Sequence, residues 1–561
     1  MKQLKLFFEK RGVLSLLFII VIVATFLRFY QLASNPPSLT WDETAWGYNA
    51  YSLGIDAKDE FGRFLPLTYL ESFGDFKPPV YAYLTVIPVK IFGLTEFATR
   101  FASAFFGVLT VLLTYFLVKE LLLRSELKKR QKETIALLSS LLLAISPWHI
   151  LLSRAAFEQN VATFFVGLGV YLFLVSVHHK KWLLIGSVLS FLLAMNTFNT
   201  PRIIAPILLI TLLLWNIRYL YKNMKKQVIT AGIVGGILFI PLFLFLLTPQ
   251  SKLRFQEVNI FSDSSIVLTA NQEIANDHNA MWSKVIHNRR LGYAEDFLKH
   301  YFDNLNPSFL FITGDGNPKF STQQTGEMYI WEIIFVVAGV FFLFKKREGD
   351  HWWFPVFWFL VAIIPAATAR ETPHALRIEN GLPMPQFFTA YGLYYVVTGL
   401  KGRVFRLPIK KIAVAIIFLT ALGNFLYFYH DYFTFYPSTY SGEWQYGYKD
   451  ALTYVQKEQN KYTHIVMTEA LGRPYIYSLF YEKYSPQAFR KNANITRDAF
   501  GFVDVHSFGK FVFLAVAANG KQQYKKSLFI DAPNDVPKNA HILKNFDLLN
   551  GNPSLVAYTV D

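Results

Sequence analysis

The stretch that decides the fold is VLSLLFIIVIVATFLRFYQL, residues 13–32, which is followed after a short spacer by SLTWDETAWG, residues 38–47. The first part is apolar over about 20 residues, the length that a helix needs to cross the hydrocarbon core of a bilayer. Two adjacent carboxylates, Asp42 and Glu43, then lie between tryptophans. The pattern predicts a membrane span whose end leads directly into a polar site.

The composition extends this prediction to the whole chain. The 561 residues are 53% hydrophobic and only 17% charged, whereas soluble domains carry about 25% charged residues. Many further stretches of span length lack charge, so we expect a polytopic α-helical membrane protein. The first span lacks a small-residue cleavage site, which argues against a signal peptide. The chain has no cysteine, which excludes disulfides and cysteine-based metal sites or nucleophiles.

The net charge of +16 reflects membrane orientation rather than nucleic-acid binding, because the basic residues cluster in short loops between apolar segments. If every basic loop is cytoplasmic, the chain has about eleven spans, with the N-terminus cytoplasmic and the C-terminus external in the plasma membrane. The predicted spans lie near residues 13–33, 97–118, 134–151, 160–177, 182–198, 201–217, 228–248, 327–344, 352–369, 381–400 and 412–430.

The same reasoning predicts two domains. Residues 1–430 form the membrane domain, with a first external loop at 34–96 and a large external loop at 249–326. A short, tyrosine-rich apolar stretch at 78–93 is expected to be an interfacial or re-entrant helix rather than a span. Residues 431–561 alternate helix-like and strand-like stretches, which predicts a small external α/β domain.

Polar side chains gather at the predicted external ends of the spans, where residues distant in sequence share one side of the membrane. The span centres hold almost no ionisable groups, which argues against an ion-coupled transporter. The candidates also have structural interpretations: acids at a helix start, a snorkelling lysine, a helix-surface ion pair or a helix cap. They are Asp42, Glu43, Asp75, Lys77, Arg154, Glu158, Arg202, Arg370, His374 and Arg377.

Several motifs, in this order, resemble bacterial members of the protein O-mannosyltransferase and aminoarabinose transferase superfamily, which are membrane glycosyltransferases of the C-type fold. The resemblance covers roughly the first 430 residues. It rests on the apolar first span and then on WDE (41–43), KPP (77–79), ATRFASAFFGVLTVLLTY (98–115), SPWHILLSRAAFEQN (146–160) and PHALR (373–377).

The resemblance implies an inverting transfer of sugar from a polyprenyl-phosphate donor to a cell-envelope acceptor on the outer face. It implies that Asp42 is the catalytic base and that Lys77 binds the donor phosphate, with Arg154, Arg370 or Arg377 in support. Glu158 is the expected acid of the second loop, and the predicted substrate-binding set also includes Asp75, Arg202 and His374.

Adjacent residues cannot both face one point on a regular element, so one of the two acids should act chemically and the other support it. We expect Asp42 to be the acting acid and Glu43 the supporting one. The resemblance leaves a divalent cation possible as a cofactor, because some relatives have an acid directly before the lysine. This chain has Phe76 at that place, which argues against such a site here. The sequence itself assigns no metal ligand.

Three other functions compete with this interpretation. A polysaccharide polymerase or ligase would also use external polar loops, and only the first-loop acid with Lys-Pro-Pro favours the transferase over it. A flippase or transporter predicts inverted repeats and charged residues in mid-span. A membrane-anchored binding protein would act through its tail, and it would tolerate the loss of the Asp42 carboxylate.

Overall fold

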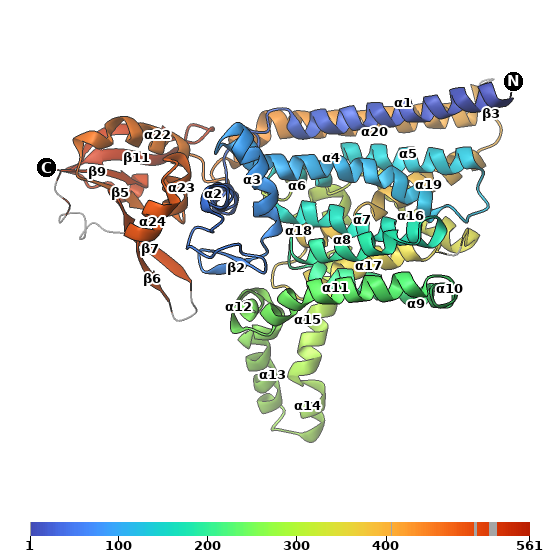
Figure 1. Cartoon of the computed structure of the whole chain (residues 1–561), viewed down its shortest axis with the longest axis horizontal. Coiled ribbons are helices and arrows are strands. Elements are labelled where there is room, and N and C mark those ends of the chain that lie inside the picture. The colour runs from blue at the N-terminus through green and yellow to red at the C-terminus, as the bar shows by residue number, and fades with distance from the viewer. Residues whose placement is uncertain are drawn as a thin grey trace. The chain divides into compact units, whose positions relative to one another are not determined.

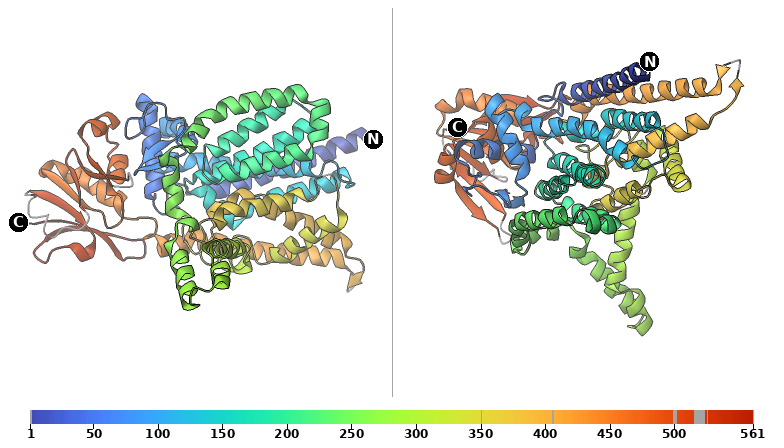
Figure 2. Two further views of the ribbon diagram at one scale, coloured as in Figure 1. Left: turned by 90° about the horizontal axis from the view of Figure 1, so that it is seen from below. Right: turned by 45° about the vertical axis from the view of Figure 1, so that its right-hand side comes forward.

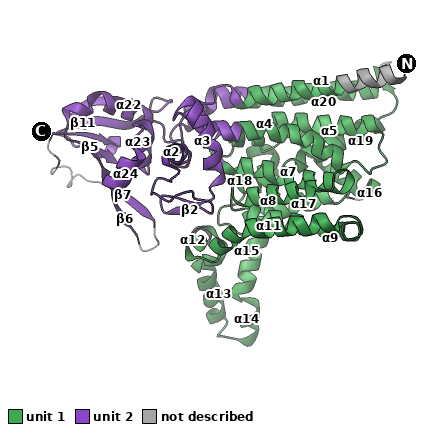
Figure 3. Ribbon diagram, viewed as in Figure 1, with its two compact units in different colours: residues 1–28, 105–153, 158–428 green, residues 29–104, 154–157, 429–561 purple. Residues whose placement is uncertain are grey.

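Apolar helices form most of unit 1, one of two compact units into which the chain divides (Figure 3). The computed structural model describes residues 2–349, 351–404, 407–498, 502–514, 524 and 526–560. Unit 1 consists of residues 1–28, 105–153 and 158–428, and unit 2 of residues 29–104, 154–157 and 429–561.

The helices of unit 1 follow the leucine- and phenylalanine-rich runs of the sequence. The first nine, of which α4 begins in unit 2 while α1 and α6 end there, are α1 (Lys2–Phe29), α4 (Glu96–Leu121), α5 (Lys129–Ile145), α6 (Pro147–Arg154), α7 (Glu158–His178), α8 (Leu183–Met195), α9 (Pro201–Trp215), α10 (Ile217–Asn223) and α11 (Lys225–Leu246). The later ones are α12 (Pro249–Val258), α13 (Ser264–Asn276), α14 (Met281–Ile286), α15 (Arg289–Asp303), α16 (Glu332–Lys346), α17 (Phe354–Ala367), α18 (Ala375–Ile378), α19 (Met384–Gly399) and α20 (Ile409–His430).

The multi-pass membrane character is confirmed, whereas the number of spans is not. Among the residues that the structure describes, five helices are long and apolar enough to cross a membrane, and the number rises to seven if the bent pairs α5–α6 (54°) and α9–α10 (70°) each count as one span. Each of the eleven predicted spans coincides with an apolar helix, but α8, α16, α17 and α19 have only 13 to 16 residues. A straight span needs about 20, so the total of about eleven stays a prediction.

Close helix packing in unit 1 depends on small residues. A Cβ atom at Gly339 of α16 would lie 2.0 Å from the backbone oxygen of Phe388, and one at Gly392 of α19 would lie 2.0 Å from that of Phe335. The two helices therefore touch backbone to backbone, as small residues allow in membrane proteins. Helix α8 likewise packs against both α7 and α11 (Figure 2).

The predicted large external loop is mainly helical. Helices α12 to α15 occupy most of it, and α13 packs along α15 in an arm that extends from the other helices of unit 1 (Figure 1). A π-helix, Phe309–Thr313, follows the arm. Residues 313–318, TGDGNP, then form a turn in which Gly314 has φ +74°.

The C-terminal part of unit 2 is a sheet covered by helices, which confirms the predicted α/β tail. The helices are α21 (Tyr436–Tyr440), α22 (Tyr448–Glu458), α23 (Pro474–Tyr481) and α24 (Pro486–Asn492). The strands run in the order β10-β11-β9-β5-β8-β7-β6, and β5 is parallel to β8 and β9 while the other pairs are antiparallel. Their bounds are β5 (His464–Thr468), β6 (Asn494–Arg497), β7 (Val503–Phe508), β8 (Phe511–Leu514), β9 (Ser527–Asp531), β10 (His541–Asp547) and β11 (Pro553–Thr559).

The predicted first external loop shares its hydrophobic core with this tail. It folds as α2 (Trp41–Asp56), the hairpin β1 (Leu70–Ser72) and β2 (Asp75–Lys77), and α3 (Val80–Phe92). Leu39, Tyr48 and Phe73 of the loop are buried in one cluster with Tyr475 and Phe480 of the tail. The loop that carries the candidate acids is therefore built together with residues more than 400 positions away.

Candidate functional site

The start of α2 fixes the two candidate acids in different directions. Thr40 caps the helix in a capping box: its hydroxyl accepts from the backbone N–H of Glu43, and the Glu43 carboxylate accepts from the backbone N–H of Thr40. This reciprocal pair satisfies two backbone donors that a helix start leaves free. Glu43 is thereby turned toward the protein interior, while the side chain of Asp42 stays 53% exposed.

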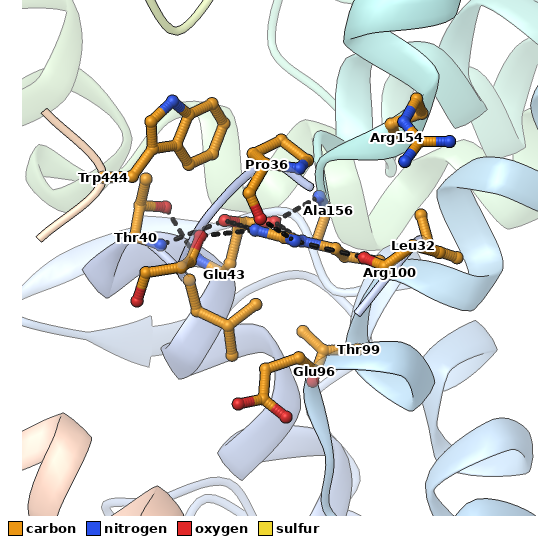
Figure 4. Close-up of polar contacts among 12 residues, drawn as sticks. Leu32, Pro36, Thr40, Glu43, Glu96, Thr99, Arg100, Arg154, Ala156 and Trp444 are labelled. Atoms are coloured by element: carbon orange, nitrogen blue, oxygen red, sulfur yellow. Dashed lines mark hydrogen bonds and ion pairs between the residues drawn. The ribbon is translucent and has the colours of Figure 1, made fainter. Parts of the chain in front are cut away.

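Glu43 is the centre of a buried ion-pair network (Figure 4). Arg100 of α4 donates from Nε to Oε1 over 2.8 Å and from Nη2 to Oε2 over 3.1 Å, and both residues are fully buried. The backbone N–H of Ala156 also donates to Oε1, at 2.8 Å. Arg100 further donates to the carbonyls of Leu32, Pro36 and Ser38. Because both charges have hydrogen-bonding partners on several sides, Glu43 has the environment of a structural group.

Lys77 lies at the end of β2 and forms an ion pair with Asp42. Its ammonium lies 5.3 Å from the ring centroid of Trp46 and 5.2 Å from that of Phe73. The hairpin turn is Phe73-Gly74, with φ +61° and +79°, values that match the twist of a two-residue hairpin loop. The lysine side chain is only 8% exposed, so a short, rigid hairpin presents a nearly buried cation to a half-exposed carboxylate.

A second carboxyl group lies near Lys77, but it is held in a neutral state. Glu60 is fully buried and accepts hydrogen bonds from Asn49, Ser72 and Tyr475. Burial raises the pKa of Glu60 to about 8, although its bond to Ser72 and the charge of Lys77 act in the opposite direction. At neutral pH the charge of Lys77 is therefore balanced by Asp42 rather than by Glu60.

This environment predicts a pH-dependent stability. The pKa of Glu60 in the folded protein is about 8, above its ordinary value of 4.5. Between these two pH values the folded state binds more protons than the unfolded state, so the free energy of unfolding falls as the pH rises from 4.5 to 8. Across this pH range we expect the free energy of unfolding of Glu60→Gln to rise relative to that of the wild type, by at most about 1.4 kcal/mol per pH unit. Unfolding in detergent between pH 5 and 9 measures this difference. Glu443→Gln, at an exposed acid, is the control, and parallel curves for Glu60→Gln and the wild type would contradict the prediction.

The other candidates in unit 2 have structural contacts. Asp75 begins β2, where it pairs with Ser72 across the hairpin. Arg154 is buried and donates to the carbonyls of Tyr30 and Asn35, both at 2.7 Å. Its guanidinium also lies near the rings of Tyr432 and Phe433. Arg154 thus ties the segment before α2 to the start of the tail.

The remaining candidates belong to unit 1. Glu158 begins α7, Arg202 near the start of α9 donates to the Met195 carbonyl, and Arg377 donates to the Glu371 carbonyl over 3.4 Å. Arg370 donates to the carbonyl of Asn259. None of these contacts tests the predicted roles, so donor binding by these residues stays a prediction.

His374 lies against the turn at 313–318. Its Nδ1 is 3.8 Å from the Asp315 carboxylate, and its ring lies tilted by 33° against that of Phe320 with 4.9 Å between centroids. Burial lowers the pKa of His374 well below its ordinary value, and burial raises the pKa of Asp315 to about 6. The pair is therefore a neutral histidine beside a carboxylate that also accepts from the backbone N–H groups of Asn317 and Ala375.

Residues 18–259 match the family model for dolichyl-phosphate-mannose-protein mannosyltransferase. The chain resembles the C-type-fold membrane glycosyltransferases. The crystal structure of apo ArnT from Cupriavidus metallidurans is 12% identical and covers 98% of both chains with a TM-score of 0.54. ArnT bound to undecaprenyl phosphate has a TM-score of 0.51 at 12% identity, and covers 96% of this chain and 97% of that one.

Two further proteins are similar to this chain. The Archaeoglobus fulgidus oligosaccharyltransferase, in its apo form, is 15% identical and covers 85% of this chain and 64% of that one with a TM-score of 0.50. An uncharacterised protein of Aquifex aeolicus is 32% identical over 181 residues, which are 31% of this chain and 33% of the relative's length. The structural likenesses establish the C-type fold, and the expected resemblance is confirmed.

Sequence reasoning missed two groups of this candidate site. It placed Arg100 merely near the end of a span, although a guanidinium within an apolar segment requires a buried partner, and that requirement was the available signal. It also overlooked Glu60 and its hydroxyl donor Tyr475, which lies 415 residues away. Within the described part of the chain, no three His, Asp or Glu side chains gather as a metal-ligand set.

Proposed function

We propose that this chain is an inverting glycosyltransferase that moves a sugar from a polyprenyl-phosphate donor to a cell-envelope acceptor. The observation that carries the proposal is the ion pair between the half-exposed Asp42 and the nearly buried Lys77. The pair combines a base that substrate can reach with a fixed cation for a leaving phosphate. The match to a mannosyltransferase family model and the C-type fold support it.

Asp42 takes the proton in the proposed reaction. The acceptor hydroxyl oxygen attacks the anomeric carbon, the bond from that carbon to the phosphate oxygen breaks, and the hydroxyl proton passes to the Asp42 carboxylate. Attack from the side opposite the phosphate inverts the anomeric centre. A positioned base contributes about 10²–10⁴-fold to such a step.

Lys77 stabilises the departing lipid phosphate, which leaves with the electron pair of the broken bond. A preorganised cation aimed at developing charge is often the largest catalytic contribution. The hairpin holds this ammonium between two aromatic rings, so little reorganisation is needed. A donor phosphate must share or take the position beside Lys77 that the Asp42 carboxylate occupies. When the phosphate binds there, the Asp42 carboxylate is released from Lys77 and can act as a base.

The proposal places this chemistry on the outer face of the plasma membrane. The basic loops support a cytoplasmic N-terminus and an external C-terminus. The common core of the first loop and the tail also supports one side for both, since Tyr48 and Phe480 are buried in the same cluster. The tail is then positioned to select the acceptor.

The competition for Lys77 predicts opposite effects of two substitutions on binding of undecaprenyl phosphate. We expect Lys77→Met to weaken binding about 10- to 100-fold, because a hydrogen bond to a charged group contributes about 1.5–3 kcal/mol. We expect Asp42→Asn to strengthen binding several-fold, because the competing carboxylate is gone. Microscale thermophoresis in detergent measures both constants, with Lys449→Met, at an exposed lysine of unit 2, as control. Weakening in both site variants would contradict the competition.

The test of the function is sugar transfer in membranes that contain the purified chain. A lipid-phosphate sugar labelled in the sugar is added, and label is followed into the envelope fraction and into the lipid. We expect label to leave the lipid for the acceptor. Movement of intact labelled lipid across the bilayer without transfer would instead indicate a flippase, and growth of a repeating glycan would indicate a polymerase.

A further inference from the structure

Unit 1 contains a pocket between α5, α19 and α20 that none of the proposed transfer residues lines. Its volume is about 800 Å³, within the range of about 300–1,000 Å³ that is typical of sites for small molecules. Helices α5 and α19 pack against each other, and both line the pocket together with residues of α20.

One end of the pocket is basic. Lys128 and Arg130 lie at the start of α5 and Lys410 lies at the start of α20, and all three are exposed. None of the three has a carboxylate partner among the residues that the structure describes, and no Asp or Glu lines the pocket. Their positive charge is therefore available to an anion at this end.

The rest of the pocket is apolar and elongated. It follows α5 from Lys128 to Ile145 and faces Val414, Phe418 and Phe425 of α20. The 17 residues of α5 correspond to about 25 Å at 1.5 Å per residue, close to the thickness of a hydrocarbon core of about 30 Å. Only Phe428 is buried within α20, whose residues 409–430 are all described, so this helix leaves its apolar side chains for lipid to cover.

We propose that the pocket binds an anionic glycerophospholipid. An acyl chain lies along α5 and the headgroup phosphate pairs with Lys128, Arg130 and Lys410. Basic pockets between membrane helices recognise anionic headgroups in this way. The lining holds no carboxylate that could act as a base, so the bound lipid is retained rather than consumed. A membrane phospholipid is proposed as the occupant rather than the sugar donor, because none of the proposed transfer residues lines the pocket.

The first test measures retention of dioleoylphosphatidylglycerol by the whole purified chain. Native mass spectrometry compares the wild type with the triple variant Lys128→Ala, Arg130→Ala, Lys410→Ala after exchange into that lipid or into dioleoylphosphatidylcholine. Each cation near a membrane surface strengthens the attraction of an anionic lipid roughly fivefold. We expect the triple variant to retain at least tenfold less of the anionic lipid, with little change for phosphatidylcholine.

A matched control distinguishes the effect of the pocket cations on lipid retention from the effect of removing any three positive charges. The triple variant Lys222→Ala, Lys225→Ala, Lys226→Ala removes three cations around α10 and α11, outside the pocket, and we expect it to retain the lipid. The single variant Ala421→Trp fills the pocket without a change in charge and should lose the lipid. Equal retention by the wild type and the pocket variants would overturn the proposal. Displacement of phosphatidylglycerol by equimolar undecaprenyl phosphate would overturn it as well, because the pocket would then be a donor site.

Discussion

We expect Asp42→Asn to reduce sugar transfer by about 10²–10⁴-fold and to leave the thermal unfolding midpoint nearly unchanged. The reduction is the typical contribution of a positioned base. The midpoint is preserved because the Asp42 side chain is 53% exposed, and because the isosteric asparagine keeps an oxygen that accepts a hydrogen bond from the nearly buried Lys77 ammonium. The measurement is the initial rate of label transfer from a lipid-phosphate sugar in membranes that contain equal amounts of each protein.

The design of this experiment separates a base from a merely nearby acid. Asp504→Asn changes an acid of β7 that is 57% exposed and should keep the full rate. Asp42→Glu restores a carboxylate in a displaced position and should recover part of the activity. Transfer at the wild-type rate by Asp42→Asn would refute the assignment of Asp42 as the base, whatever becomes of the donor-binding role of Lys77.

The second large effect concerns stability. We expect Arg100→Met to lower the free energy of unfolding by about 3–5 kcal/mol, because it leaves the fully buried Glu43 carboxylate without its counterion. The lost guanidinium also leaves three backbone carbonyls without their donor. Urea unfolding in mixed micelles, followed by tryptophan fluorescence, measures the change.

The double variant shows whether the pair or the individual charge matters. Arg100→Met combined with Glu43→Gln removes both charges, and it should recover part of the loss because no buried charge remains uncompensated. Lys449→Met breaks the pair between Lys449 and Glu96 on the same helix, where the lysine is 56% exposed, and should cost less than about 1 kcal/mol. A single Arg100→Met variant as stable as Lys449→Met would refute the role given to the network.

The sequence predicted the parts of the site that follow from local pattern. A helix start was the structural alternative for the acids of WDE, and the structure places them in the first turn of α2. The resemblance assigned Lys77 to the same site as Asp42, and the two residues form an ion pair. The different roles of Asp42 and Glu43 stay a prediction that rests on the geometry of adjacent residues. The capping box then determined which of the two turns inward, and it can be read from Thr40 and Glu43 in the sequence.

Contacts between distant segments could not be predicted in the same way. Glu43 meets Arg100 across 57 positions and Ala156 across 113, and no periodicity encodes such pairs. The predicted count of about eleven spans stays unconfirmed for a related reason. Hydropathy locates apolar helices, but it does not measure their unbroken length. The bends between α5 and α6 and between α9 and α10 follow from local breaks that average hydropathy does not reveal.

The shared core of the first loop and the tail has a consequence for how the protein is made. Tyr475 and Tyr477 donate to Glu60 and to the Leu39 carbonyl, and both tyrosines leave the ribosome more than 400 residues after the loop begins. The loop that carries Asp42 and Lys77 must therefore wait, with Leu39, Tyr48 and Phe73 uncovered, until the segment that contains Tyr475 and Phe480 has been synthesised. Chains that end before this segment would carry the loop with its apolar core residues exposed to proteases.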